Sequence, residues 1–242
     1  MNKITYSDRY VIVADIVGFK KIIEKENKNV VDAIIDNFFE FIKKENMLFN
    51  QIEKYGIISD TIYFVFNENV DISKVLYCAF CLTIRMPSIM IQGGISKGEI
   101  TICEYDGNTI IMGNAFINAH NFTEKYPIGM YLDYKNIFGK DALYCMNNDL
   151  VPNYIEYYLF SLPNYQNEEL LYLNFAKNKH FKIIDLYQYL ESLHTYYLNA
   201  NEEQKIRKFI ICFLILHYID YLDIVVNKEK LELYEEMKSC PK

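Results

Sequence analysis

Two aspartates are the strongest candidates for chemistry, because each lies at the end of a short apolar run. Asp15 ends the first run of YVIVADIVGFK (Tyr10–Lys20), and Asp60 lies within YGIISDTIYFVF. Short, β-branched runs are typical of buried strands, where a terminal carboxylate is costly unless it is paired or binds a cation. Mg²⁺ and Mn²⁺ prefer hard oxygen ligands and leave positions open for phosphate oxygens. We therefore expect the two acids to meet and to hold divalent ions over a nucleoside triphosphate. The alternative is that Asp15 caps a helix and Asp60 fills a turn.

The elements that position these acids follow from turn residues and hydrophobic periodicity. Asp60 is predicted at a hairpin tip, because Ser59-Asp60 separates two strand-like runs and such turns favour Ser and Asp. Gly18 permits a tight turn after the first strand, and Asp71 is expected to cap a helix. The expected strands are about Tyr10–Ile16, Gln51–Ile58, Thr61–Phe66, Ile89–Ile95, Glu99–Glu104, Thr109–Met112 and Met130–Tyr134, and the expected helices are Phe19 to about Glu45–Asn46, Asp71–Met86 and Ala115–Lys125.

This order of elements contains the βαββαβ arrangement of ferredoxin-like folds, an antiparallel sheet with helices on one face. We therefore predict an α+β domain over residues 1–140. Residues 141–175 are too irregular to assign. Helical periodicity at His180–Leu198 and Glu202–Met237 predicts a mostly helical C-terminal extension over residues 141–242. A fold of this kind hosts many functions and does not select one.

Composition and charge argue against several classes of protein. The 242 residues are 51% hydrophobic with a formal net charge of -7, which favours a folded domain and disfavours non-specific nucleic-acid binding. The first ten residues lack the apolar core that a signal peptide is expected to have. Polar residues interrupt the longest apolar stretch, 209–226, which indicates a buried helix rather than a membrane span. Six cysteines without a secretory pattern predict reduced thiols and a cytoplasmic protein. Cys78 and Cys81 are expected in the core rather than in a zinc or redox site.

The sequence resembles the class III nucleotidyl cyclases, the adenylate and guanylate cyclase catalytic domains, in four ordered blocks over about residues 8–135. The blocks are VIVADIVGF, YGIISDTIYFVF, IQGGISKGEI and IMGNAFINAHNFTE. The resemblance implies that Asp15, Ile16 and Asp60 bind two divalent ions, Mg²⁺ or Mn²⁺. It also implies that a ribose 3′-hydroxyl attacks the α-phosphate of a nucleoside triphosphate, which gives a 3′,5′-cyclic nucleotide and pyrophosphate. In this family the active sites lie at a head-to-tail dimer interface, so a homodimer is expected.

The base-reading and phosphate-binding positions of the family do not match. Purine-specific members carry Lys or Glu four residues before the second metal Asp, and a polar residue three before the helix glycine. Here these positions are Gly56 and Ile110. Neither side chain hydrogen-bonds a base edge, so adenine or guanine selection by the usual route is not expected. The helix positions that hold an Asn and an Arg in the family are Ile117 and Asn121 here.

Several further residues are candidates for nucleotide contacts, each with a structural alternative. Lys97 or Lys125 would supply the missing cation unless both are solvated. Tyr55 either stacks beside a base or packs. Lys20 and Lys21 follow the turn at Gly18 and Phe19, where either backbone N–H groups at a helix start bind phosphate or the lysines are simply charged surface. The remaining candidates are Phe19, Asn114, Asn118 and His120.

These departures favour the divergent pyrimidine cyclases of bacterial anti-phage signalling, which make cyclic UMP or cyclic CMP from UTP or CTP. Such systems act through an effector that binds the cyclic product. Two alternatives stay open. One is a catalytically inactive nucleotide-binding or dimerisation module, and the other is an adenylate or guanylate cyclase with compensating residues elsewhere.

Overall fold

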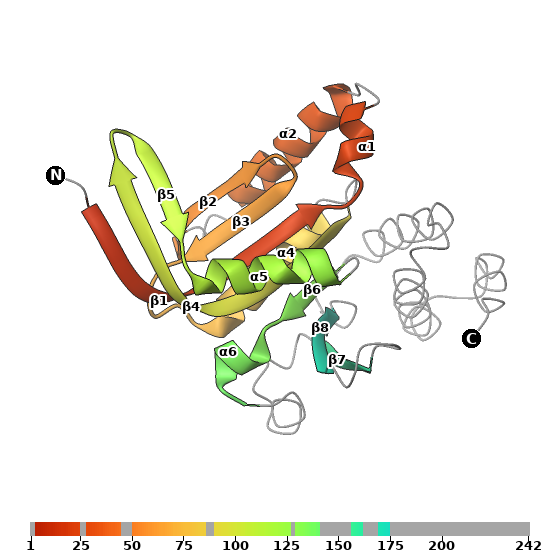
Figure 1. The fold of residues 1–242 in the computed structure, drawn as a ribbon. Helices are drawn as coiled ribbons and strands as arrows, with labels where there is room; N and C mark the ends of the chain where they lie inside the picture. The colour runs from red at the N-terminus through yellow and green to blue at the C-terminus, as the bar shows by residue number, and fades with distance from the viewer. Residues whose placement is uncertain are drawn as a thin grey trace.

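The computed structural model describes residues 3–24, 28–44, 50–85, 90–126, 129–140, 156–161 and 169–174 (Figure 1). The helices predicted at His180–Leu198 and Glu202–Met237 lie outside these residues. None of the helices in the described ranges is long and apolar enough to cross a membrane.

A mostly antiparallel sheet forms the centre of the described structure, as an α+β fold requires. Its strand order is β2-β3-β1-β4-β6-β8-β7, with β5 paired to β4 beside this path. The β4–β6 pair is parallel, because a helical crossover joins these two strands. The strands are β1 (Lys3–Ile16), β2 (Ile52–Ile58), β3 (Thr61–Phe66), β4 (Ile91–Tyr105), β5 (Asn108–Met112), β6 (Gly129–Leu132), β7 (Glu156–Ser161) and β8 (Glu169–Asn174).

Helices cover both faces of this sheet, so the expectation of helices on one face is wrong. Alternate residues of β1 point to opposite faces. Ile12 and Ala14 pack with buried residues of α2 (Lys28–Lys44) and α4 (Ile72–Arg85), whereas Val11 and Val13 pack against α5 (Asn114–Lys125). Figure 1 shows α5 in front of the strands, on the side opposite α2. The short helices α1 (Phe19–Glu24) and α6 (Tyr134–Phe138) follow β1 and β6.

Several predicted boundaries differ from the structure. The helix predicted from Phe19 to about Glu45–Asn46 is two helices, α1 (Phe19–Glu24) and α2. Three other differences have a physical reason, and long-range pairing explains two of them. Strand β1 begins at Lys3 rather than Tyr10, because its first half pairs with β4. Strand β4 is continuous over 15 residues, since β1 also pairs with Ser96–Gly98, which the sequence pattern left as a break. Tyr134 starts α6 instead of ending a strand, because the Asp133 side chain caps that helix by accepting from the Asn136 backbone N–H.

Beyond residue 140 the sheet continues. Strand β8 pairs with β6, and β7 pairs with β8, both antiparallel. The sheet therefore crosses the boundary predicted at residue 140, and these two strands lie in a segment that the sequence pattern left unassigned.

Glycine allows α5 to approach the sheet closely. A Cβ atom on Gly94 of β4 would lie 2.4 Å from Phe122 Cδ2 and 2.7 Å from the Ala119 carbonyl oxygen. Gly113, which precedes α5, has a φ of 153°, and a Cβ there would lie 2.2 Å from the Glu99 carbonyl oxygen. These two contacts account physically for Gly94 in the third sequence block and Gly113 in the fourth.

Two predictions about α4 are confirmed. The Asp71 carboxylate accepts a 2.7 Å hydrogen bond from the Ser73 backbone N–H, which is the expected cap. Cys78 and Cys81 are fully buried free thiols in the core between α4 and the sheet. Burial raises the pKa of the Cys78 thiol well above its usual value and that of Cys81 to about 12, so both are inert as ligands and nucleophiles near neutral pH.

Candidate active site

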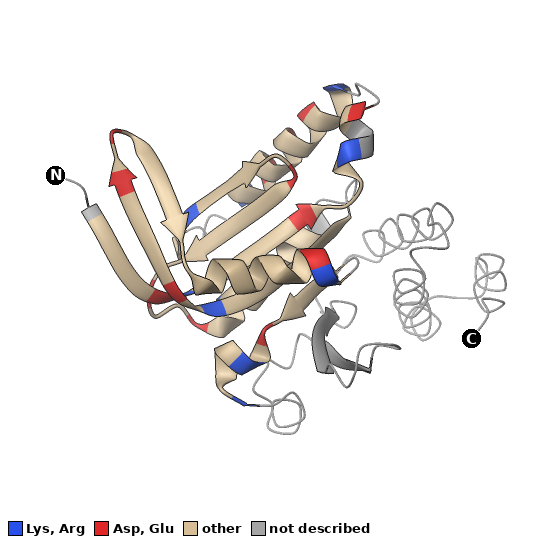
Figure 2. Cartoon of the chain, viewed as in Figure 1, with Lys and Arg blue, Asp and Glu red and all other residues tan. Residues whose placement is uncertain are grey.

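Antiparallel pairing of β1 with β3 brings the two candidate acids to the same end of the sheet. Asp15 is the direct partner of Thr61, which follows Asp60 in the chain. The Ile16 backbone N–H donates a 2.8 Å hydrogen bond to the Asp60 carbonyl oxygen. Figure 2 shows acidic positions on the arrowhead of β1 and at the turn between β2 and β3. The predicted hairpin tip is therefore confirmed, and its neighbour is the end of β1.

The Asp15 side chain lies on the same face of the sheet as α5. It alternates with the buried residues Ala14 and Ile16 and so shares the face of Val13. Its Oδ1 accepts a 2.7 Å hydrogen bond from Thr61 Oγ1. Sequence reasoning missed Thr61, although its position directly after Asp60, at the start of a strand, could have indicated it.

The oxygen atoms at this end of the sheet fit a hard divalent cation. Asp15 and Asp60 are both partly buried, and Asp15 accepts its hydrogen bond from a neutral hydroxyl. A cation would therefore offset the cost of burying the Asp15 charge. Ile16 has its side chain in the core, which leaves its backbone carbonyl as the atom able to ligate a metal. Within the described ranges no three His, Cys, Asp or Glu side chains gather. Two carboxylates and a carbonyl suit Mg²⁺ or Mn²⁺, with positions left for phosphate.

Gly56 lies on this same face, beneath an aromatic ring. It pairs directly with Tyr63 of β3, and a Cβ on Gly56 would lie 2.9 Å from the Tyr63 hydroxyl oxygen. The Tyr63 ring contacts Phe116 of α5, with centroids 5.9 Å apart. The position that reads purines in the resembling family is therefore covered by a tyrosine from the neighbouring strand.

Tyr55 lies on the opposite face of the sheet. Its ring stacks with Phe64 at a centroid distance of 6.4 Å and an interplanar angle of 26°, and it lies 6.3 Å from Phe38 of α2. In the structure the Tyr55 ring packs on these aromatic neighbours, which is one of the two interpretations given for it above. Its ring and the Asp15 carboxylate are on different sides of β3 and β1.

Ile110 is also turned away from α5. It pairs with Cys103, whereas the next pair along the ribbon, Ile102 and Ile111, packs against α5. Ile110 is 48% exposed. Within one chain, Gly56 and Ile110 are therefore on opposite faces of the sheet.

Lys97, a candidate catalytic residue from the sequence, lies on the face of the sheet opposite Asp15. It is the direct partner of Tyr10 on β1, and its Nζ lies 4.9 Å from the centre of the Tyr10 ring, against the core formed with α2 and α4. Asp15 points to the other face, so the structure does not bring Lys97 to the acids of its own chain. Alternation along β1 separates them.

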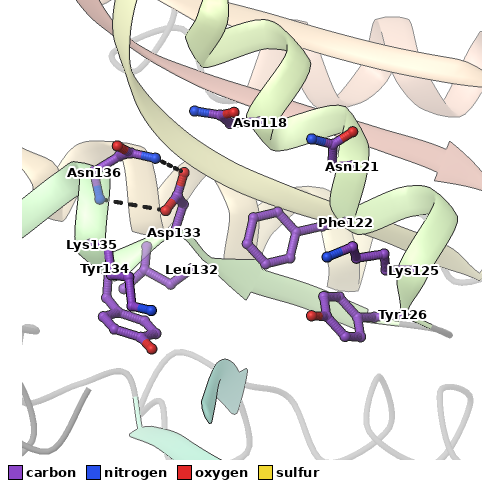
Figure 3. Close-up of a pocket in the computed structure, with 10 residues that line it drawn as sticks. All are labelled: Asn118, Asn121, Phe122, Lys125, Tyr126, Leu132, Asp133, Tyr134, Lys135 and Asn136. Atoms are coloured by element: carbon purple, nitrogen blue, oxygen red, sulfur yellow. Dashed lines mark hydrogen bonds between the residues drawn. The ribbon is translucent and has the colours of Figure 1, made fainter. Parts of the chain in front are cut away.

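The exposed side of α5 lines a cavity of about 240 Å³ between this helix and the segment that joins β6 to α6 (Figure 3). Figure 3 shows Asn118, Asn121 and Lys125 in succession along α5, facing Asp133 and Asn136. The Asp133 carboxylate already accepts from Ser96 Oγ at 2.6 Å and from Asn136 Nδ2 at 2.7 Å. The amide groups of Asn118 and Asn121 and the ammonium groups of Lys125 and Lys135 are among the polar groups that line this cavity. Its other lining residues are Phe122, Tyr126, Leu132 and Tyr134.

Asn114 and His120, two further candidates on α5, contact neighbouring parts of the protein. The Asn114 side chain turns toward β4, where its Oδ1 would lie 2.7 Å from a Cβ on Gly98. His120 is half-buried, and its backbone oxygen accepts a 2.8 Å hydrogen bond from Thr123 Oγ1. Ile117, at the family's Asn position, is 61% exposed.

The turn after β1 is arranged as predicted. Gly18 has a φ of 80°, which favours glycine, and α1 begins at Phe19. The Phe19 side chain packs against the core on the α2 face. Lys20 forms an exposed 3.8 Å ion pair with Glu24, which is the surface interpretation of that lysine.

Comparison with known proteins finds solved structures of similar fold. No protein-family model and no curated protein matches this sequence. The guanylate cyclase domain of RhGC from Catenaria anguillulae in complex with GTP is 12% identical, with 71% of this chain and 98% of that chain covered at a TM-score of 0.51. The catalytic core of a rhodopsin-guanylyl cyclase with converted specificity, in complex with ATPαS, is 13% identical, with coverage of 72% and 98% and a TM-score of 0.50. The adenylyl cyclase CyaB from P. aeruginosa is 13% identical, with coverage of 71% and 96% and a TM-score of 0.50.

Proposed function

Because this chain has the fold of the class III adenylyl and guanylyl cyclase catalytic domains, we propose that it cyclises a nucleoside triphosphate. The observation that carries the proposal is the placement of Asp15 and Asp60 at one end of the β1–β3 pair. Two partly buried carboxylates with a neutral partner on Asp15 form a site whose charge calls for a cation.

In the reaction, the ribose 3′-oxygen bonds to the α-phosphorus in line with the leaving group. The bond between the α-phosphorus and the bridging oxygen to the β-phosphate breaks, pyrophosphate leaves, and the 3′-hydroxyl proton passes to solvent. Asp15, Asp60 and the Ile16 carbonyl would hold Mg²⁺ or Mn²⁺. When bound, such ions activate the attacking hydroxyl and offset the charge of the phosphates. Thr61 keeps the Asp15 carboxylate oriented toward them.

Phosphate binding falls to α5 in this scheme. Asn121 occupies the family's Arg position without its charge, and Lys125 lies one turn further along the same side of the helix. We assign Lys125 the charge-neutralising role and Asn121 a hydrogen-bonding role. Lys97, on the far face of the sheet, has no part in the site of its own chain.

The substrate that we favour is a pyrimidine nucleotide, UTP or CTP. Gly56 and Ile110 cannot hydrogen-bond a purine at the positions where the family does so. The product would be cyclic UMP or cyclic CMP, used as a second messenger in anti-phage defence through an effector that binds it.

A homodimer would complete two sites, as in the resembling family. Its support is a row of large apolar side chains exposed on one face of the β1–β4–β5 ribbon, opposite the face packed on α5. The row consists of Ile4, Tyr6, Tyr105, Ile110 and Met112.

A non-catalytic nucleotide-binding module is the second candidate. It is favoured by Ile117 and Asn121, which replace the family's Asn and Arg on α5. The test is to incubate the protein with each of the four nucleoside triphosphates and Mn²⁺, and to measure cyclic product by mass spectrometry. We expect product that is lost in Asp60→Asn. Nucleotide binding without any product would favour the non-catalytic module, and equal activity in Asp60→Asn would rule out the metal-binding role.

A further inference from the structure

We propose that Tyr63 reads the nucleotide base and selects a pyrimidine, in place of the side chain that Gly56 lacks. This inference rests on the proposed binding of a nucleoside triphosphate at the Asp15 face of the sheet. It names a residue that the sequence pattern did not single out.

The first support is the position of the Tyr63 ring over Gly56. A Cβ on Gly56 would lie 2.9 Å from the Tyr63 hydroxyl oxygen and 3.0 Å from Cε1. Contacts this short require the ring to move. The ring therefore occupies the volume that a longer side chain at position 56 would fill. The Tyr63 ring can lie in this position because residue 56 is a glycine.

The second support is the direction in which the tyrosine points. Thr61 and Tyr63 are two residues apart on β3, so their side chains share one face about 7 Å apart. That face holds the Asp15 carboxylate, which Thr61 contacts. Phe116 of α5 packs against the other side of the ring, 5.9 Å between centroids. The hydroxyl is thus held on the metal-binding face by the sheet and by α5.

The third support is chemical. A phenol hydroxyl both donates and accepts hydrogen bonds, as the edge of uracil or cytosine requires. Because the ring already covers Gly56, a base must meet the hydroxyl rather than lie over the glycine. In the proposed binding mode, the ring takes up volume over Gly56 that the second ring of a purine would need.

The test measures binding as well as turnover. Non-cyclisable α,β-methylene analogues of UTP, CTP, ATP and GTP are titrated with Mn²⁺ by calorimetry, and cyclic products are measured from the natural nucleotides. Tyr63→Phe keeps the ring and removes the hydroxyl. Tyr55→Phe is the matched control, because Tyr55 is an aromatic of the same hairpin on the opposite face. We expect pyrimidine analogues to bind tighter to the wild type, a loss of this preference of about tenfold in Tyr63→Phe, and no change in Tyr55→Phe.

Gly56→Ala tests the same arrangement from the other strand. Gly56 is not among the glycines with positive φ, so an alanine there displaces the Tyr63 ring without straining its own backbone. We expect the folded protein to lose base preference as Tyr63→Phe does.

The outcomes separate this inference from the proposed reaction. Cyclic product with an unchanged base preference in Tyr63→Phe overturns the role of Tyr63 and leaves the cyclase. Selective binding that depends on Tyr63, without product, supports the role of Tyr63 and removes the reaction. A wild type that binds purine analogues as well as pyrimidine ones, or binds none, overturns the inference.

Discussion

Thr61 Oγ1 donates a 2.7 Å hydrogen bond to Asp15 Oδ1, between two residues that are direct partners in the β1–β3 pair. The bond fixes one oxygen of a carboxylate that lies at the end of a buried strand. The donor is uncharged, so the negative charge of Asp15 stays available to a cation. Thr61 is therefore a positioning residue for the proposed metal site.

Replacing Thr61 by valine is expected to weaken metal binding. Loss of a hydrogen-bonding partner behind a metal ligand typically costs about 10- to 100-fold in affinity or activity. We expect the Mn²⁺ concentration for half-maximal cyclisation to rise by that order in Thr61→Val. Thr61→Ser, which keeps the hydroxyl, should restore it. An unchanged Mn²⁺ dependence in Thr61→Val would contradict this role.

Lys125 and Lys97 form a matched pair of lysines on opposite faces of the sheet. Removing a charged hydrogen-bond donor from a phosphate site costs about tenfold or more in binding. Lys125→Ala should therefore raise the Kd for the triphosphate analogue by about that factor, and Lys97→Ala should leave it unchanged. The reverse pattern in calorimetry would show that the assignment of the cation is wrong.

Met112 tests the proposed dimer. It is 59% exposed within the apolar row on the β1–β4–β5 ribbon. A carboxylate placed in an apolar interface loses its hydration without gaining a partner. We expect Met112→Asp to shift sedimentation toward the monomer. Ile35→Asp, at an exposed position of α2, serves as the control. Equal sedimentation of both variants would contradict the proposal that the ribbon forms the dimer interface.

Arg9 is expected to stabilise the fold. Its side chain is 3% exposed and forms ion pairs with Glu53 and Glu68, and its Nε donates to Ser7 Oγ at 2.7 Å. Both glutamates are partly exposed and would rehydrate. We therefore expect Arg9→Met to lower the free energy of unfolding by about 1–3 kcal/mol rather than by the larger cost of a fully buried pair. Urea unfolding measures this.

Lys43→Ala is the control for Arg9. It removes an exposed 3.6 Å pair with Glu40, which should change the unfolding free energy by less than about 0.5 kcal/mol. A loss in Arg9→Met no larger than that in Lys43→Ala would contradict the stabilising role.

Because Cys78 and Cys81 of α4 are buried, we expect the folded protein to lose stability at alkaline pH. Burial raises the pKa of Cys81 to about 12 and that of Cys78 well above its usual value, whereas an unfolded thiol titrates near about 8.5. Above that pH the unfolded chain releases protons that the folded chain retains. The free energy of unfolding then falls as pH rises, by about 1.4 kcal/mol per pH unit for each thiol.

The measurement is chemical unfolding at a series of pH values from neutral to strongly alkaline. Cys81→Ala should reduce the slope by one thiol's share and leave the neutral-pH fold intact. A slope that is the same with and without Cys81 would contradict the assignment.

The arrangement of Asp15 and Asp60 at the proposed metal site was predictable because its signals are local. Apolar runs that end at Asp15 and Asp60, with a Ser-Asp turn between two strands, are sufficient to predict the hairpin. What the sequence pattern did not supply is the side of the sheet on which each residue lies. Lys97 and Tyr55 were candidates for the site from the sequence, yet both lie on the face of the sheet opposite the Asp15 carboxylate. Strand pairing and the two-residue alternation decide this, and neither is visible until the register is known.

Tyr63 and α6 were missed for related reasons. Tyr63 looked like one more aromatic of a buried strand, and its closeness to Gly56 depends on the register of β2 against β3. Helix α6 is five residues long and depends on the cap at Asp133 rather than on a periodic pattern. Strand β4 appeared broken at Ser96–Gly98, because only β1 shows that this stretch is paired.

The alternation along β1 also limits how this chain can change length during evolution or engineering. One residue inserted between Val11 and Ala14 would exchange the two faces, and would turn the Asp15 carboxylate into the apolar core beneath α2 and α4. The turn at Asp106-Gly107 is different, because it ends the β4–β5 ribbon and a Cβ on Gly107 would meet nothing within 4 Å. A peptide tag or a fluorescent reporter inserted at that turn would leave the register of β1 unchanged.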